Sequence, residues 1–166
     1  MEIYCTTSEV GVFNVCVKIA QFVSIVLLVV NTISAPKFSE LFWQNKTQEL
    51  QKLLDYSSKM IFYGSLIISI FLIVLSSVIL AFFGSEFVSG KYILIILVFG
   101  QIINSITGSV GIFLSMTGNE KVLRNILVIS TFAVLIAYII VIPFFGSLGA
   151  AIIMFLGSCF VNIPAV

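Results

Sequence analysis

The sequence predicts an all-α integral membrane protein with about five transmembrane helices. Of its 166 residues, 60% are hydrophobic and only 9% are charged. A soluble domain carries about 25% charged residues and cannot bury so much apolar surface. Three long runs carry no charge at all, namely 60–85, 92–119 and 125–166. Because a spanning helix needs roughly 20 apolar residues, the first two runs each hold one span and the third holds two.

The whole chain, 1–166, is predicted to be a single polytopic membrane region. Its spans are expected at 11–34, 58–83, 92–116, 122–143 and 146–165. Dense charge makes 35–57 an amphipathic connector, in which Pro36 occupies the first turn of a short interfacial helix. Between the last two spans, Pro143 discourages helix continuation and Gly146 permits an unusual backbone angle.

The distribution of Lys and Arg predicts the orientation of these spans. One side of the membrane receives six of these residues, and the other receives only Lys91. The six are Lys37, Lys46, Lys52, Lys59, Lys121 and Arg124. By the positive-inside rule the first side is cytoplasmic, so the N-terminus lies outside and the C-terminus inside. An outward start and an odd number of spans lead us to expect that the chain is part of something longer.

Polar residues within the spans are predicted to face the bundle interior or a watery cavity, since exposure to lipid is costly. At about 100° per residue, the third span carries one continuous stripe, bordered by Gln101 and Ser105. The stripe consists of Gly100, Asn104, Gly108, Gly111 and Ser115. Ser65, Ser69 and Ser76 align in the same way on the second span. Either close helix packing or the wall of a transport cavity would explain these faces.

In the first span, Asn14, Lys18, Gln21 and Thr32 share a narrow face. Lys18 lies about 9 Å inside the outer end, at 1.5 Å per residue. Its stem can snorkel to the interface, or its ammonium can face a cavity and attract an anionic head group. Arg124 lies at a cytoplasmic helix entry, where it either anchors the helix at the membrane surface or attracts the same anionic head group. The candidate lumen-facing or substrate-facing residues are Lys18, Asn14, Gln21, Gln101, Asn104 and Arg124.

Several function classes are disfavoured by the composition. Histidine is absent and no span carries paired carboxylates, so we predict no catalytic residue and no enzyme activity. Cys5, Cys16 and Cys159 are scattered, which predicts neither a disulfide framework nor a metal site, and no cofactor is expected. No basic patch with interleaved aromatic residues is present, so nucleic acid is not an expected partner.

Five stretches, in order along the chain, resemble one family. They are SEVGVFNVCVKIAQ, NTISAPKFSELFWQNKTQELQKLLDYSSKM, FFGSEF, YILIILVFGQIINSITGSVGIFLSMTGNEKVLRNIL and IPFFGSLGAAI. Together they resemble the polysaccharide and lipid-linked oligosaccharide flippases of the MOP superfamily, most of all its Wzx-type O-antigen branch. The drug-exporting MATE branch is a more distant likeness. Phe13 stands where the family usually has Tyr.

The resemblance implies both a fold and a function. The chain looks like the second of two pseudo-symmetric halves, without that half's first helix. The family implies transport of an undecaprenyl-pyrophosphate-linked oligosaccharide repeat unit across the bacterial cytoplasmic (inner) membrane for O-antigen or capsule biosynthesis. Because such transporters bind substrate between two halves, a separately encoded first half or a second copy is expected as partner. Lys18, and after it Arg124, would meet the pyrophosphate.

Other interpretations stay open at this point. A MATE-like cation-coupled exporter fragment would need an intramembrane Asp or Glu, and none of the predicted spans contains one. A non-transporting membrane scaffold or a decayed gene fragment is consistent with the missing first half. A membrane enzyme is disfavoured because acid–base groups are absent from the spans.

Overall fold

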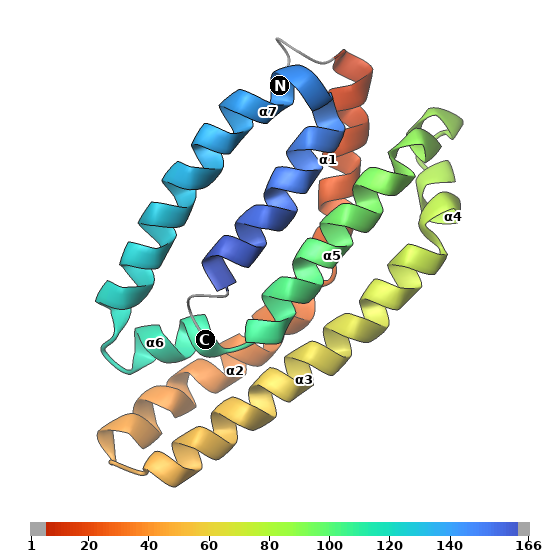
Figure 1. Cartoon of the computed structure of the whole chain (residues 1–166). Helices are drawn as coiled ribbons and strands as arrows, with labels where there is room; N and C mark the ends of the chain where they lie inside the picture. Colours follow the sequence, from red (N-terminus) through yellow and green to blue (C-terminus); the bar gives the residue numbers. More distant parts are fainter. Residues whose placement is uncertain (1–5, 163–166) are drawn as a thin grey trace.

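The computed structural model describes residues 6–162, which form an all-α bundle without a strand (Figure 1). The elements are α1 (Thr7–Gln21), α2 (Ser24–Trp43), α3 (Thr47–Val74), α4 (Ser76–Ala81), the 3₁₀ helix η1 (Ser85–Gly90), α5 (Lys91–Thr107), α6 (Val110–Met116) and α7 (Glu120–Asn162). Four helical segments are long and apolar enough to cross a membrane: α2, α3, η1 with α5, and α7. The protein is therefore a multi-pass, all-α membrane protein, as the composition predicts.

Helix α5 lies at the centre of the bundle. It packs against α7, α3 and α1, and α2 packs along α3 (Figure 1). The main apolar core fills the space around α5 and includes the fully buried Cys16, Val23, Leu80, Leu94 and Val98. A smaller core lies at the other end of the bundle, where Phe38 meets the ring of Phe113 edge-on with the centroids 5.8 Å apart.

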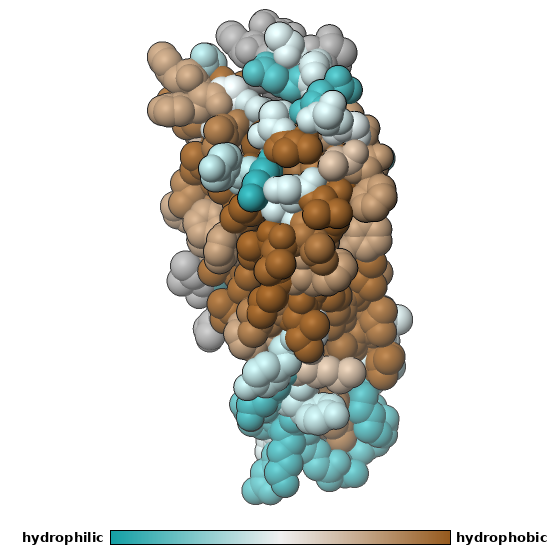
Figure 2. All heavy atoms as spheres, turned by 90° about the vertical axis from the view of Figure 1, so that its right-hand side faces the viewer, coloured by the Kyte–Doolittle hydropathy of each residue, from teal (hydrophilic) through white to brown (hydrophobic). Residues whose placement is uncertain are grey.

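The turns of the chain gather at two opposite ends. The start of α1, η1 and the turn in α7 lie at one end, while the α2–α3 turn, α6 and the last turn of α7 lie at the other (Figure 1). Figure 2 shows an apolar belt between two hydrophilic ends. At the α2–α3 end, ion pairs join Lys37 to Glu40 at 2.8 Å and Lys46 to Glu49 at 3.9 Å. This banded surface suits a chain that crosses a bilayer several times.

The predicted first span, 11–34, is not one helix. At Phe22 and Val23 the backbone N–H groups bond to the carbonyls three residues earlier, and this tight turn separates α1 from α2. The apolar pattern runs through the break unchanged, which is why hydropathy does not reveal it. The hydroxyl of Ser65 donates to the Val23 carbonyl at 3.4 Å, so α3 satisfies a backbone acceptor next to the turn.

The prediction of a separate short helix from Pro36 is wrong. Helix α2 continues through Pro36 to Trp43, so the 35–57 connector consists of the end of α2, a short turn and the start of α3. A proline inside a helix costs about 3 kcal/mol. Phe38 and Leu41 are buried beyond it, and each contributes about 1.5–3 kcal/mol when fully buried. Continuing the helix therefore gains more than the lost hydrogen bond costs.

The predicted third span, 92–116, is divided between α5 and α6, so its stripe does not run along one continuous helix. The prediction that the stripe faces a cavity is confirmed for Asn104, Gly108, Gly111 and Ser115, which line one hollow. Helix α5 stops at Thr107, and α6 runs across the end of the bundle (Figure 1). Gly108 has φ 54° and ψ −116°, and Ser109 has φ −87° and ψ 1°. These are the angles of a type II′ turn, whose first central position favours glycine. A Cβ on Gly108 would lie 2.9 Å from the Cα of Ser58 on α3.

The remaining spans are also divided differently from the prediction. The second, 58–83, belongs to α3 and α4, which are separated at Leu75, and α3 starts already at Thr47. Ser65, Ser69 and Ser76 are fully buried, as their predicted inward face requires. The last two spans form limbs 120–145 and 147–162 of α7. The unusual backbone angle predicted for Gly146 is confirmed (φ 53°), whereas the helix continues through Pro143. Residues 163–165 of the fifth span, Cys5 and the C-terminal residue lie outside the described part.

Candidate functional site

Asn104 marks the place where two hollows in the bundle meet. It is half-buried on α5, three residues before the helix ends. Both hollows have a volume of about 410 Å³, and both are lined by Asn104, Val161 and Asn162. The two hollows therefore form neighbouring parts of one groove along α5 and α7.

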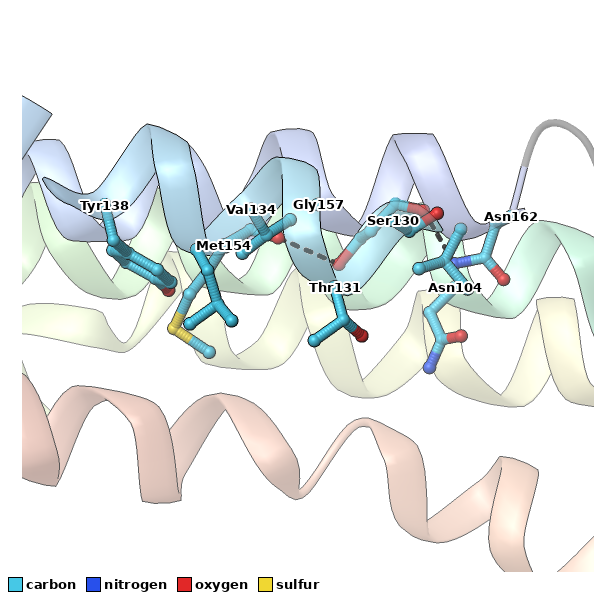
Figure 3. Close-up of a pocket in the computed structure, with 11 residues that line it drawn as sticks. Asn104, Ser130, Thr131, Val134, Tyr138, Met154, Gly157 and Asn162 are labelled. Atoms are coloured by element: carbon cyan, nitrogen blue, oxygen red, sulfur yellow. Dashed lines mark hydrogen bonds between the residues drawn. The ribbon is translucent and has the colours of Figure 1, made fainter. Parts of the chain in front are cut away.

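The first hollow lies between the two limbs of α7 and α5 (Figure 3). Its polar lining comprises Asn104, Ser130, Thr131, Tyr138, Ser158 and Asn162. Figure 3 shows Tyr138, Met154, Thr131 and Asn104 pointing to the same side of α7. In the second limb, the Ser158 hydroxyl donates to the Met154 carbonyl at 3.1 Å, and Asn162 Nδ2 donates to the Ser158 carbonyl at 2.7 Å.

The second hollow lies among α2, α5, α6 and the ends of α7. Its polar lining comprises Asn31, Thr32, Asn104, Thr107, Ser115 and Asn162. Asn31 is only 7% exposed, and its Oδ1 has no hydrogen-bond partner among the described residues. A buried carboxamide oxygen without a partner costs about 1–3 kcal/mol, and the buried hydroxyl oxygens of Ser69 and Ser109 likewise have no partner among the described residues.

A short hydrogen-bond network fixes the wall between the hollows. The Thr107 hydroxyl oxygen lies 2.6 Å from Asn162 Oδ1 and 2.9 Å from the Asn104 carbonyl oxygen. Since this hydroxyl has one proton, the two acceptors share it. The donation from Asn162 Nδ2 to Ser158 sets which end of the amide faces Thr107. The end of α7 is thereby tied to the end of α5, 55 residues away in the sequence.

The lining of both hollows is polar but uncharged. Among the described residues, no Asp, Glu, Lys or Arg side chain lines either one. Within the same part of the chain, no three His, Cys, Asp or Glu side chains gather as a metal centre requires. The groove therefore offers hydroxyl and carboxamide groups, which match neutral hydrogen-bonding ligands such as sugars.

The structure brings together only part of the predicted site. Asn104 lines both hollows, and Thr32 lines the second. Asn14, Lys18 and Gln21 are exposed on α1, line neither hollow and make no side-chain hydrogen bond within residues 6–162. They form a polar row on the exposed side of α1, away from the side that packs into the main apolar core.

Gln101 and Arg124 are set apart from the groove. Gln101 is half-buried on α5, and its carbonyl accepts the hydroxyl proton of Ser105 at 2.8 Å, but its side chain lines neither hollow. Arg124 is exposed near the start of α7, where Leu123 and Leu127 beside it line the second hollow. Neither side chain therefore belongs to the lining of the groove.

Sequence reasoning missed two of the three carboxamides in the groove. Asn31 and Asn162 each interrupt an apolar run, which is the same signal that selected Asn104. Asn31 lies within the predicted first span, 11–34, but at about 100° per residue it falls off the face that Asn14, Lys18, Gln21 and Thr32 share. Asn162 was hidden because only the fold back at Gly146 carries it to the end of α5.

Comparison with known proteins identifies no relative. The chain matches no protein-family model, no curated protein and no solved structure.

Proposed function

We propose that the chain is part of a membrane flippase that moves undecaprenyl-pyrophosphate-linked oligosaccharide from the cytoplasmic to the outer leaflet of a bacterial inner membrane. The observation that carries this proposal is the uncharged polar groove centred on Asn104. Sugar hydroxyls both donate and accept hydrogen bonds, and the carboxamides and hydroxyls of the groove do the same. A groove of this kind receives a sugar without desolvating an unpaired charge.

The polar row on α1 supports a second element of the proposal. Asn14, Lys18 and Gln21 are exposed on α1, which packs against the spanning helix α5, and facing lipid there would be costly for all three. A cavity shared with a partner lobe would hydrate them. Lys18, which belongs to neither ion pair of the described residues, would then supply the positive charge for the pyrophosphate. The partner lobe would be a separately encoded first half or a second copy of this chain.

The proposed orientation follows the positive-inside rule. The end of the bundle that carries the α2–α3 turn would be cytoplasmic, and the end that carries η1 would face outward. The MATE-like alternative gains no support from the groove, because none of its described lining residues is a carboxylate that could hold a coupling ion. A non-transporting scaffold is the outcome that a negative binding experiment would favour.

Binding of the lipid-linked sugar tests the proposal. The full chain, purified in a neutral detergent, would be titrated with fluorescent undecaprenyl-pyrophosphate-linked oligosaccharide and, for comparison, with fluorescent undecaprenol. Lys18→Ala is expected to weaken binding of the lipid-linked sugar about fivefold, the effect of one cation. Asn104→Leu is expected to weaken it about two- to tenfold, the effect of one hydrogen bond.

Lys91→Ala is the matched control, because Lys91 is an exposed lysine at the same end of the bundle as the start of α1. The Lys91→Ala variant should bind the lipid-linked sugar as tightly as the unaltered chain. If the chain binds undecaprenol as tightly as the lipid-linked sugar, the proposed function fails and the scaffold interpretation takes its place.

A further inference from the structure

Lys59 on α3 stands where the polar end of the bundle meets its apolar belt. It is the last charged residue before the uncharged run 60–85. Helix α3 starts at Thr47, so Lys59 lies about 18 Å along it at 1.5 Å per residue. The apolar stretch that follows is long enough to cross the hydrocarbon core. Figure 2 shows the same boundary between the hydrophilic end and the apolar belt.

A hollow of about 380 Å³ opens on the bundle surface beside Lys59. It is lined by Ser58, Lys59, Phe62, Tyr63 and Ile106, so α3 forms one wall and the last turn of α5 the other. Phe62 and Tyr63 hold their rings 5.5 Å apart at 65°. Tyr63 is 62% exposed and Ile106 is 55% exposed, so a large part of each side chain is open to the surroundings.

Two contacts make the hollow a defined part of the fold. The backbone N–H of Ser109, in the turn after α5, donates to the Ser58 hydroxyl oxygen at 3.5 Å. Gly108 in the same turn approaches the Cα of Ser58 so closely that a Cβ would lie 2.9 Å from it. The two walls are therefore held together at Ser58, which lines the hollow.

The cation in the hollow has no anionic partner within the described residues. The ion pairs of that part of the chain join Lys37 to Glu40 and Lys46 to Glu49, and neither includes Lys59. The nearest acid along the helix face is Asp55, four residues earlier, and its Oδ1 accepts from Gln51 Nε2 at 3.3 Å. The Lys59 ammonium is thus available to an anion from outside the chain.

We propose that this hollow binds one anionic phospholipid, independently of the flippase function. The phosphate of the headgroup accepts from Lys59 Nζ and from the Tyr63 hydroxyl, and an acyl chain lies along Phe62 and Ile106. Lysine and tyrosine are the residues that meet headgroups at a membrane interface. A phospholipid fits better than free phosphate, because the hollow offers one cation and its remaining surface is mostly apolar, which an acyl chain covers at about 25 cal/mol per Å².

The test measures lipid retained by the full chain in native mass spectra, recorded from a neutral detergent. The probes are phosphatidylglycerol, phosphatidylcholine with the same acyl chains, and glycerol 3-phosphate as a headgroup without chains. The unaltered chain should retain phosphatidylglycerol in preference to phosphatidylcholine and retain no glycerol 3-phosphate. Lys59→Gln should lower the apparent affinity for phosphatidylglycerol about fivefold.

Two further variants separate the site from a general charge effect. Lys52→Gln removes a lysine from the same face of α3, two helical turns closer to the α2–α3 turn. It should leave retention of phosphatidylglycerol unchanged. Ile106→Trp fills the hollow at an exposed position and should lower retention with Lys59 intact. Equal losses in Lys59→Gln and Lys52→Gln, or unchanged retention in both Lys59→Gln and Ile106→Trp, would overturn the proposal. Because Lys18→Ala should not alter phosphatidylglycerol retention, this result is distinguishable from the test of the flippase function.

Discussion

Because of the type II′ turn after α5, we expect that adding one methyl group at Gly108 lowers the stability of the fold strongly. Gly108→Ala places a side chain at φ 54° and ψ −116°, a region that costs a non-glycine residue about 1–3 kcal/mol. The added Cβ also lies 2.9 Å from the Cα of Ser58, which is backbone and cannot rotate away. Overpacking of this kind costs about 1–3 kcal/mol. The combined destabilisation is therefore about 2–6 kcal/mol.

The assay is thermal unfolding of the purified chain in detergent, followed by the fraction that stays monodisperse on size-exclusion chromatography after heating. In a chain of this length, 1 kcal/mol shifts Tm by about 2–4 °C, so Gly108→Ala should lower Tm by at least about 4 °C. Gly111→Ala is the matched control. Gly108 and Gly111 both line the second hollow of the groove, but a Cβ on Gly111 meets nothing within 4 Å. Its Tm should stay equal or rise, because alanine favours the helix. Equal Tm values for both variants would refute the proposed role of the turn.

Three further predictions use the same preparation. Thr107→Val leaves the buried Oδ1 of Asn162 without its donor and should cost about 1–3 kcal/mol, seen as a lower Tm; an unchanged Tm would contradict the shared hydrogen bond. Asn31→Leu removes a carboxamide whose buried Oδ1 is unpaired, so Tm should rise by about 2–4 °C per kcal/mol gained while affinity for the lipid-linked sugar falls; a lower Tm would contradict the first expectation and an unchanged affinity the second. Asn45→Cys and Ser85→Cys lie at opposite ends of the bundle and should react with a membrane-impermeant thiol reagent from opposite sides; labelling of both from one side would contradict the topology.

The sequence predicted the fold class well because hydropathy records which residues avoid water. Uncharged runs mark the spans, and each predicted span falls largely within helices. The breaks inside the spans were not predictable in the same way. The turn at Phe22 and Val23 and the turn at Gly108 lie within apolar sequence, so the average hydropathy does not change across them. Gly108 belonged to a regular small-residue stripe, and only the approach of Ser58 shows why glycine is needed there.

Proline was a poorer guide than glycine in this chain. Pro36 and Pro143 both lie inside helices, whereas Gly146, with φ 53°, is the residue at which α7 reverses. Burial of neighbouring apolar residues compensates for a lost backbone hydrogen bond at a proline. A reversal, by contrast, needs backbone angles that only glycine adopts without strain. The carboxamide of Asn162 reaches the groove because of this reversal, so its role could not be inferred from local sequence.

The polar residues of the bundle fall into two kinds, and the difference bears on whether the groove only serves packing. On α3, Ser65, Ser69 and Ser76 are fully buried and small, which is what close approach of helices requires. The groove instead gathers the carboxamides of Asn31, Asn104 and Asn162 from three helices around open volume. Ser69 Oγ on α3 and Asn31 Oδ1 in the groove are both buried without a hydrogen-bond partner among the described residues, so an unpaired oxygen does not separate the two kinds. The difference is that the three carboxamides line open volume that a ligand can enter. The position of these carboxamides beside open volume therefore favours a ligand that pairs with them.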